Sequence, residues 1–183
     1  MSEWNRTRIR DLEIQSLHTF ILDAARDFLK GRVLDYGCGK QPYRCVVEHV
    51  GGVYFPYDRK EFSGNVSGED VGVPGKTKQF DPLNIQQWDA ILCTQIFNFV
   101  PYPATLFQKF HWALKPSGIL VLTYTTSWEE AEAGDLWRFT RQGINFLLNN
   151  AGFEILIHTV RAAVELEDFR FPLGGGVVAR RGS

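Results

Sequence analysis

The 183-residue chain predicts an α/β fold in which helices cover both faces of a doubly wound, mostly parallel sheet. Apolar segments of strand length alternate with segments whose apolar residues recur at helical spacing. The strand segments are apolar throughout, as expected when both faces of a sheet are covered. The length suits one domain, and no internal repeat or low-complexity linker interrupts the chain, so residues 1–183 are predicted to form a single domain.

The first half of the chain predicts two strand–helix units. Apolar residues at helical spacing indicate a helix over 11–29, within an N-terminal segment of residues 1–30, and Gly31 ends it. A short buried strand follows over 32–36, then a helix over 43–50 and a second strand over 53–57. The basic residues Arg6, Arg8 and Arg10 precede the first helix. Two alternatives stay open for them, a lid over a bound cofactor or a frayed terminus.

The second half predicts five further strands, seven in total. A long loop from residue 59 holds one weak strand over 77–80, and a clear strand follows over 88–94. Prolines 101 and 103 begin a helix whose apolar face includes Leu106, Phe107, Phe110 and Leu114, and a turn over 115–118 leads into a strand over 119–124. Thr140 caps the next helix, and strands follow over 153–160 and 177–180. Because no helix separates these two strands, the last strand is expected to be antiparallel, at the sheet edge.

Composition excludes several classes of protein. Hydrophobic residues make up 44% and charged residues 22%, which is ordinary globular composition. The formal net charge of -1 argues against nucleic acid as the partner. The three cysteines show no disulfide framework and no metal-ligand spacing, so we expect reduced thiols, no metal and a cytoplasmic protein. No apolar run approaches about 18 residues, so no membrane span is expected. The oligomeric state is left open.

A glycine turn after the first strand is the most informative segment. Gly37 and Gly39 allow close approach of the backbone to a ligand, but Pro42 stands where a dinucleotide-binding turn has its third glycine. Asp35 precedes the turn, and its carboxylate favours a cation over a phosphate. Asp58 ends the second strand, where an acid accepts hydrogen bonds from ribose hydroxyls. A cation and a ribose together describe S-adenosylmethionine; the alternative is a tight turn with surface acids.

Four blocks of the sequence resemble class I S-adenosylmethionine-dependent methyltransferases, within a bacterial subgroup similar to methyltransferase type 11. They are VLDYGCGKQPYR, WDAILCTQIFNFVPYP, ALKPSGILVLTYT and DLWRFTRQGINFLLNNAGFEI. The resemblance implies the Rossmann-like methyltransferase fold and S-adenosyl-L-methionine as cofactor. It implies that Asp35, Tyr36, Gly37, Cys38 and Gly39 contact its methionine part and that Asp58 holds its ribose. Asp81 or Asp70 would face the adenine, and Thr94 and Gln95 would border the sulfonium.

The residues for catalysis and for the acceptor are less sharply indicated. Where relatives read Glu-His-Val-Pro after the fourth strand, this chain has Asn98 to Pro101, so a histidine base is missing. Glu129, Glu130 and Asp135 are weak candidates for a general base, and a solvated acidic face is the alternative. Trp128 and Arg138 are candidates to contact the substrate, although Arg138 could instead orient its loop. His111 is predicted to be structural.

These observations leave two hypotheses from different classes. The first is an S-adenosylmethionine-dependent methyltransferase acting on a small-molecule or glycan-type acceptor, namely a sugar, a lipid-linked glycan or a secondary metabolite. The second is a non-catalytic module of the same fold that serves as a binding or complex subunit. A nicotinamide-dependent oxidoreductase is a weaker third hypothesis, because Pro42 disrupts the dinucleotide motif.

Overall fold

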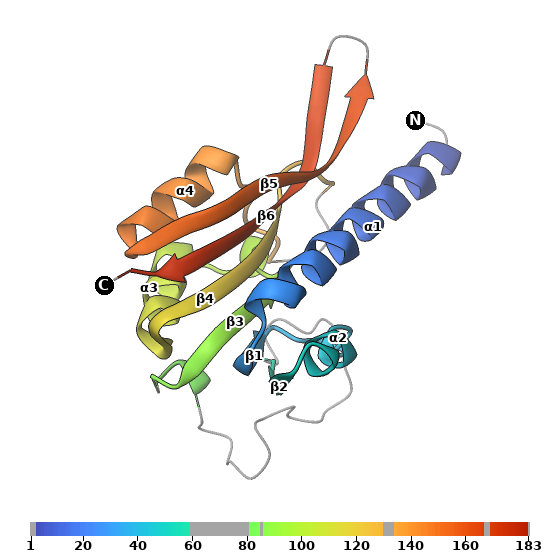
Figure 1. The fold of residues 1–183 in the computed structure, drawn as a ribbon. Coiled ribbons are helices and arrows are strands. Elements are labelled where there is room, and N and C mark those ends of the chain that lie inside the picture. The colour runs from blue at the N-terminus through green and yellow to red at the C-terminus, as the bar shows by residue number, and fades with distance from the viewer. Residues whose placement is uncertain (1–2, 59–80, 85, 130–133, 167–168, 183) are drawn as a thin grey trace.

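A computed structural model describes residues 3–58, 81–84, 86–129, 134–166 and 169–182. Six strands within these residues form one sheet in the order β2-β1-β3-β4-β6-β5 (Figure 1). The predicted weak strand over 77–80 lies outside the described residues. The bounds of the strands are β1 Gly31–Tyr36, β2 Gly52–Tyr57, β3 Trp88–Thr94, β4 Leu114–Thr125, β5 Phe153–Leu166 and β6 Phe169–Arg181. The bounds of the helices are α1 Glu3–Phe28, α2 Arg44–His49, α3 Pro103–Ala113 and α4 Arg141–Asn150, with short 3-10 helices η1 Pro82–Asn84 and η2 Phe97–Phe99.

The sheet is mixed, as predicted. β1, β2, β3 and β4 pair in parallel, and β6 is antiparallel to both of its neighbours. The predicted antiparallel direction of the last strand is confirmed, but its predicted edge position is wrong. β6 lies between β4 and β5, and β5 is the edge strand. The reason is burial: Val177, Val178 and Ala179 are fully buried, which a partner strand on each side makes possible.

The last two strands are longer than the sequence predicted. β5 continues past Val160 to Leu166, and β6 begins at Phe169 instead of near Val177. The mixed residues between the two predicted strands therefore extend a β-hairpin, which projects beyond the rest of the sheet on the side of the N-terminal half of α1 (Figure 1). Polar and apolar residues are mixed in this hairpin without a continuous apolar run, so the hydrophobic pattern of the sequence did not predict strands there.

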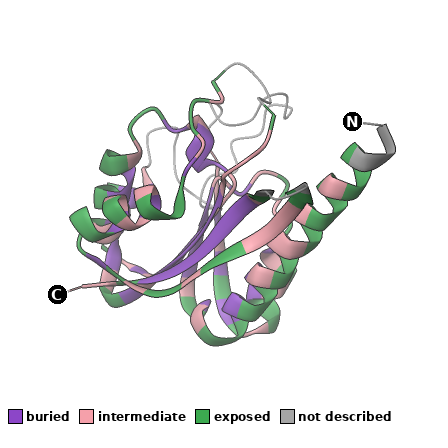
Figure 2. Ribbon diagram, turned by 90° about the horizontal axis from the view of Figure 1, so that it is seen from above, coloured by how far each residue is buried: buried purple, intermediate pink, exposed green. Residues whose placement is uncertain are grey.

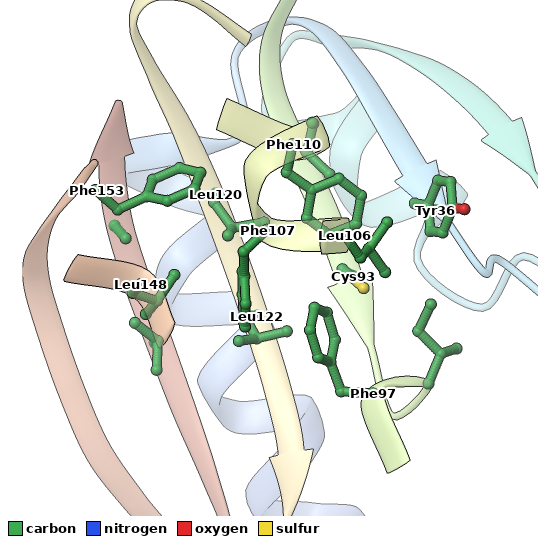
Figure 3. Packing of buried hydrophobic residues seen from close by; sticks show 14 of the residues in the cluster. Tyr36, Cys93, Phe97, Leu106, Phe107, Phe110, Leu120, Leu122, Leu148 and Phe153 are labelled. Carbon is green, nitrogen blue, oxygen red and sulfur yellow. The ribbon is translucent and has the colours of Figure 1, made fainter. Parts of the chain in front are cut away.

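Two hydrophobic clusters occupy the two faces of the sheet. On one face α3 and α4 pack through residues such as Phe107, Phe110 and Leu148 (Figure 3). On the other face α1 and α2 pack through Ile21 and Val47. Viewed from above, the buried strands lie between helices whose outer sides are exposed (Figure 2). The layered α/β architecture predicted from the sequence is thus confirmed.

Three local predictions had different outcomes. Thr140 is the N-cap of α4, and its hydroxyl oxygen accepts a hydrogen bond from the Gly143 N–H at 3.0 Å, as predicted. The apolar face of α3 ends at Phe110 and Ala113, because Leu114 already begins β4. The predicted turn over 115–118 falls inside β4, where Ser117 has a left-handed φ of 62° and the pairing with β3 is irregular.

α1 is one continuous helix that begins eight residues before the predicted start. Its C-terminal half buries Ile21, Ala24 and Ala25 against the sheet, whereas its N-terminal half is mostly exposed. Arg6, Arg8 and Arg10 therefore lie within this helix. No helix in the described ranges is both long enough and apolar enough to cross a bilayer.

Candidate active site

The glycine turn lies where the connections leave the sheet in opposite directions. β1 sits between β2 and β3, its chain continues to α2 on one face, and the chain after β3 continues to α3 on the other. Ligands of doubly wound sheets bind at such switch points. The N–H groups of Gly37 and Cys38 donate to the Tyr57 carbonyl at 2.7 and 3.2 Å, which fixes the turn to the end of β2. A Cβ at Gly37 would lie 2.6 Å from the Ile96 side chain, so only glycine fits there.

Asp58 joins the same turn, as the sequence predicted from its place after the second strand. Its Oδ2 accepts a hydrogen bond from the Gly39 N–H at 3.1 Å. A Cβ at Gly39 would meet no atom within 4 Å, so the turn is open on that side. The structure thus brings Asp35, Asp58 and the two glycines together at the carboxyl ends of β1 and β2.

Asp35 is fully buried at the end of β1. Its Oδ2 accepts a hydrogen bond of 2.5 Å from the Tyr54 hydroxyl, and its Oδ1 is buried without a hydrogen-bond partner among the described residues. Burial raises the pKa of Asp35 to about 7, and the charge of Asp58 adds to the rise while the Tyr54 hydrogen bond opposes it. A cation placed against this carboxyl group would ionise it and satisfy the second oxygen.

Tyr36 and Cys38 have side chains that belong to the core. The Tyr36 ring stacks on Tyr57 at 5.2 Å between centroids and meets Phe110 edge-on at 5.1 Å, on the α3 side of the sheet. Burial and the nearby charge of Asp35 raise the pKa of the Cys38 thiol to about 12, which keeps it neutral. Of these two predicted cofactor contacts, only the backbone can face a ligand at the turn.

Thr94 and Gln95 lie at the carboxyl end of β3, beside the glycine turn. Gln95 has a left-handed φ of 57°, which is uncommon for a residue other than glycine and is typical of functional sites. Its N–H donates to the Thr123 carbonyl at 3.3 Å, and its side-chain Nε2 donates to Glu13 Oε1 at 2.7 Å. The sequence predicted these two positions but not the link to α1.

Arg161 and Glu13 form a part of the site that the sequence did not reveal. The Arg161 Nη2 donates to Glu13 Oε1 at 2.8 Å, and its Nε donates to the Gly175 carbonyl at 3.0 Å. The Arg161 side chain is fully buried, and Glu13 is 17% exposed. The two residues are 148 positions apart, and neither lies in a recognisable motif, so no local signal could have paired them.

Asp81 is not brought to the glycine turn. Its Oδ1 accepts from the Leu83 N–H at 3.0 Å at the start of η1, and its Oδ2 lies 3.5 Å from Lys109 Nζ. The adjacent Pro82 carbonyl accepts from the indole N–H of Trp88, the first residue of β3. Asp81 therefore lies towards the amino end of β3, away from the carboxyl ends that form the site. Asp70, the alternative for the adenine, lies outside the described residues.

Arg138 and Asp135 hold the loop that follows β4. The guanidinium of Arg138 donates to both carboxylate oxygens of Asp135 at 2.6 and 2.7 Å and to the carbonyls of Trp128 and Glu129. Asp135, whose side chain is 1% exposed, also accepts from Asn98. These contacts fit the alternative in which Arg138 orients its loop. Because Asp135 binds Arg138, it fits a structural role better than the role of a general base.

Two further candidates are exposed to a cavity, and one lies outside the described residues. Trp128 and Glu129 line a cavity of about 600 Å³ between α1, the loop after β4 and the β5–β6 hairpin. Glu130 lies outside the described residues. His111 meets the Phe153 ring edge-on at 5.3 Å at the far end of α3, which fits its predicted structural role.

Comparisons with known proteins agree with this geometry. A model of the methyltransferase domain family matches residues 6–156. A search of curated proteins found no match. Solved structures with similar folds include an S-adenosylmethionine-dependent methyltransferase from Mesorhizobium loti, at 18% identity and a TM-score of 0.63, over 87% of this chain and 95% of that one.

Two other solved structures resemble the chain over most of both lengths. One is an S-adenosylmethionine-dependent methyltransferase from Clostridium acetobutylicum, at 12% identity and a TM-score of 0.62, over 92% of each chain. The other is magnesium protoporphyrin IX methyltransferase from Synechocystis with bound S-adenosylmethionine, at 15% identity and a TM-score of 0.61, over 100% of this chain and 86% of that one. At these identities the likeness shows a shared fold. The family match covers most of the chain, and so the chain belongs to the methyltransferase domain family, the S-adenosylmethionine-dependent enzymes of this fold.

Proposed function

We propose that this chain transfers the methyl group of S-adenosylmethionine to a small-molecule or glycan-type acceptor, with the cofactor held beside the Gly37–Gly39 turn. The observation that carries the proposal is the pair of carboxyl groups on that turn. Asp35 offers a buried oxygen without a described partner, and Asp58 contacts the Gly39 N–H from the end of β2. One suits a cationic amino group, and the other suits ribose hydroxyls.

The residues present fit this cofactor better than a dinucleotide. A pyrophosphate beside Asp35 would face a buried acid, whereas an ammonium group would satisfy its Oδ1. Asp35 and Tyr54 would hold the methionine end, Asp58 the ribose, and Gln95 would border the sulfur. The open side of Gly39 leaves the backbone accessible to a ligand.

For methyl transfer, the main task of the protein is to align the acceptor with the methyl group of the cofactor. When bound, the cofactor supplies an electrophilic methyl group that an acceptor displaces in line. The rigid turn fixes one reactant, and the loop held by Arg138 fixes the wall against which the other lies. A base is dispensable when the acceptor atom is already ionised or is a neutral amine; for a hydroxyl acceptor, Glu129 is the described carboxylate in the cavity wall.

Calorimetric titration with S-adenosylmethionine, S-adenosylhomocysteine and NAD tests the cofactor. Binding of the first two but not NAD is expected, and Asp58→Asn should weaken binding by about 1–3 kcal/mol, because it removes a charge-assisted hydrogen bond. Asp23→Asn is the matched control, since Asp23 is an exposed acid on the outer part of α1. Unchanged affinity in Asp58→Asn would contradict the ribose assignment.

A turnover screen separates the enzyme from the non-catalytic alternative. The assay follows S-adenosylhomocysteine produced from sugars, phenols, amines and carboxylic acids. Formation of product with any of these small acceptors supports the proposal. Tight binding of the cofactor without turnover on any acceptor would favour the non-catalytic module.

A further inference from the structure

We propose that the cavity between α1, the loop after β4 and the β5–β6 hairpin is the acceptor site, and that it selects an amphipathic anion. Such an acceptor carries an apolar ring or chain together with a carboxylate, phosphate or similar group. The inference rests on the proposed function, which supplies the methyl group, but the cavity can be tested without it.

The position of the cavity follows from the contacts of Gln95. Gln95 binds Glu13 of α1, and Arg10 lies one helical turn before Glu13 in the cavity wall. On the other side, the Thr125 hydroxyl lies 3.4 Å from Gln95 Oε1, and Ser127 in the cavity wall follows two residues later. The cavity therefore begins next to the carboxyl ends of β3 and β4, on the same side of the sheet as the glycine turn at the carboxyl end of β1.

The hairpin and the loop form one continuous wall. The N–H groups of Thr126 and Ser127 donate to the Leu173 carbonyl at 3.0 and 3.4 Å, which joins the loop after β4 to β6. α1 lies on the opposite side of the cavity, and Figure 1 shows its N-terminal half next to the projecting hairpin. The longer hairpin that the sequence did not predict thus encloses a space beside the site.

The lining is apolar with a cationic side. Apolar contact surface comes from Ile9 of α1 and from three hairpin residues, Val164, Phe171 and Leu173. Phe171 is 43% exposed, which is high for an aromatic residue, and an apolar ligand would cover it. An acceptor without an apolar part would leave this surface in contact with water.

Among the described lining residues, the charge comes from two arginines and one glutamate. Arg6 lies 3.9 Å from Glu129, and both side chains are well exposed, so this ion pair is weak and Glu129 neutralises at most one arginine. Arg10 makes no hydrogen bond or ion pair with the part of the chain that the structure describes. The described residues of the cavity wall therefore carry one cation in excess, which complements an anionic group on the ligand.

A pair of probes that differ only in charge tests both features. 2-Naphthoate and 2-naphthamide share an aromatic ring system, and their affinities are measured by calorimetry with S-adenosylhomocysteine present. We expect naphthoate to bind about tenfold more tightly, as one charge-assisted contact predicts. Arg10→Gln should remove this preference without changing the affinity of naphthamide. Phe171→Ser should weaken both probes by the same factor, and the control Arg26→Gln, on the same helix outside the cavity, should change neither.

Each result decides a separate part of the inference. Equal affinities of the two probes in the wild-type protein would overturn the selection of an anion. Binding of S-adenosylhomocysteine without binding of either probe would overturn the cavity as acceptor site and leave the proposed cofactor site intact. If S-adenosylhomocysteine itself fails to bind, the proposed function fails, and the same titrations in buffer alone still test the cavity. Arg10 is exposed, so we expect Arg10→Gln to leave the fold intact. The charge test therefore remains available even if Phe171→Ser proves unstable.

Discussion

Asp35 shows how one residue can serve a site at the expense of folding. A carboxyl group that is fully buried loses its hydration, and among the described residues only the Tyr54 hydroxyl donates a hydrogen bond to one of its oxygens. The acid is therefore held with a pKa of about 7, against 3.8 in an exposed chain. A bound cation would compensate the second oxygen, which has no hydrogen-bond partner among the described residues.

Asp35 makes the stability of the protein depend on pH in a defined direction. Because its folded-state pKa is raised, the folded protein holds a proton between about pH 4 and 7 that the unfolded chain has lost, so stability falls as pH rises through this window. The full loss is of the order of 4 kcal/mol. Asp35→Asn, which still accepts from Tyr54, should therefore gain stability relative to wild type at pH 8 but not at pH 4.

Urea unfolding at both pH values, expressed as the difference between variant and wild type, measures this effect. Taking the difference cancels the titration of all other groups. Asp23→Asn, which replaces an exposed acid of α1, is the control measured in the same way. An Asp35→Asn difference that is independent of pH would mean that Asp35 ionises normally in the fold.

Gly175 is a residue at which the packing leaves room for glycine alone. A Cβ at this position would overlap the ring of Tyr124 on the neighbouring strand. Gly175→Ala should therefore destabilise the protein by about 1–3 kcal/mol through overpacking. In a Tyr124→Leu background, where the ring is absent, the same substitution should cost less, and a double-mutant cycle by urea unfolding measures the difference. Equal costs in both backgrounds would show that the Tyr124 ring is not the obstacle.

At the scale of elements, Glu13 links α1 to the site through hydrogen bonds. Glu13 accepts hydrogen bonds from Gln95 of the β3 end and from Arg161 of β5, so one carboxylate joins a helix, a strand end and the hairpin. The first turns of α1 bury little apolar surface, so this junction is what holds them over the cavity.

Glu13→Gln should loosen the N-terminal half of α1. It leaves the fully buried Arg161 guanidinium without its carboxylate, which costs about 3 kcal/mol in comparable buried pairs. Faster amide exchange in residues 6–16 and a lower urea midpoint are expected. Asp23→Asn breaks the exposed Asp23–Arg26 pair on the same helix and should cost less than about 1 kcal/mol. Similar effects of the two substitutions would show that the buried pair does not hold α1.

At the scale of the whole molecule, the order of the sheet makes the C-terminus essential. β6 is inserted between β4 and β5, so the last residues of the chain fill an interior position, where Val177 and Val178 are fully buried. The edge strand β5 has no other partner than β6 in the described sheet. The chain therefore cannot complete its core before its final strand has been added.

Truncation before Gly175 should consequently abolish folding instead of trimming an edge. The shortened chain loses the pairing of β6 with β4 and β5 from Gly175 onward and the burial of Val177, Val178 and Ala179, and it is expected to show no cooperative thermal transition by circular dichroism. Removal of Gly182 and Ser183 alone is the control and should leave the transition close to that of the full chain. A cooperative transition in the longer truncation would contradict the interior role of β6.

The local part of the fold was predictable because neighbouring residues determine it. The strand over 88–94, the Thr140 cap and the apolar face of α3 depend on hydrophobic spacing, capping side chains and proline geometry within about ten residues. The meeting of Asp35 and Asp58 at the glycine turn was predictable for a different reason, because parallel strand order places the ends of β1 and β2 together.

The amino-acid sequence by itself determined the fold class, the glycine turn after the first strand and the membership in the methyltransferase family. Only the tertiary structure decided that β6 lies inside the sheet, that Arg161 and Glu13 meet, and that the hairpin and α1 enclose a cavity. These features depend on contacts between residues far apart in the sequence. Glu13 and Arg161 are 148 positions apart, and their attraction appears only after the sheet has brought them into the same low-dielectric environment.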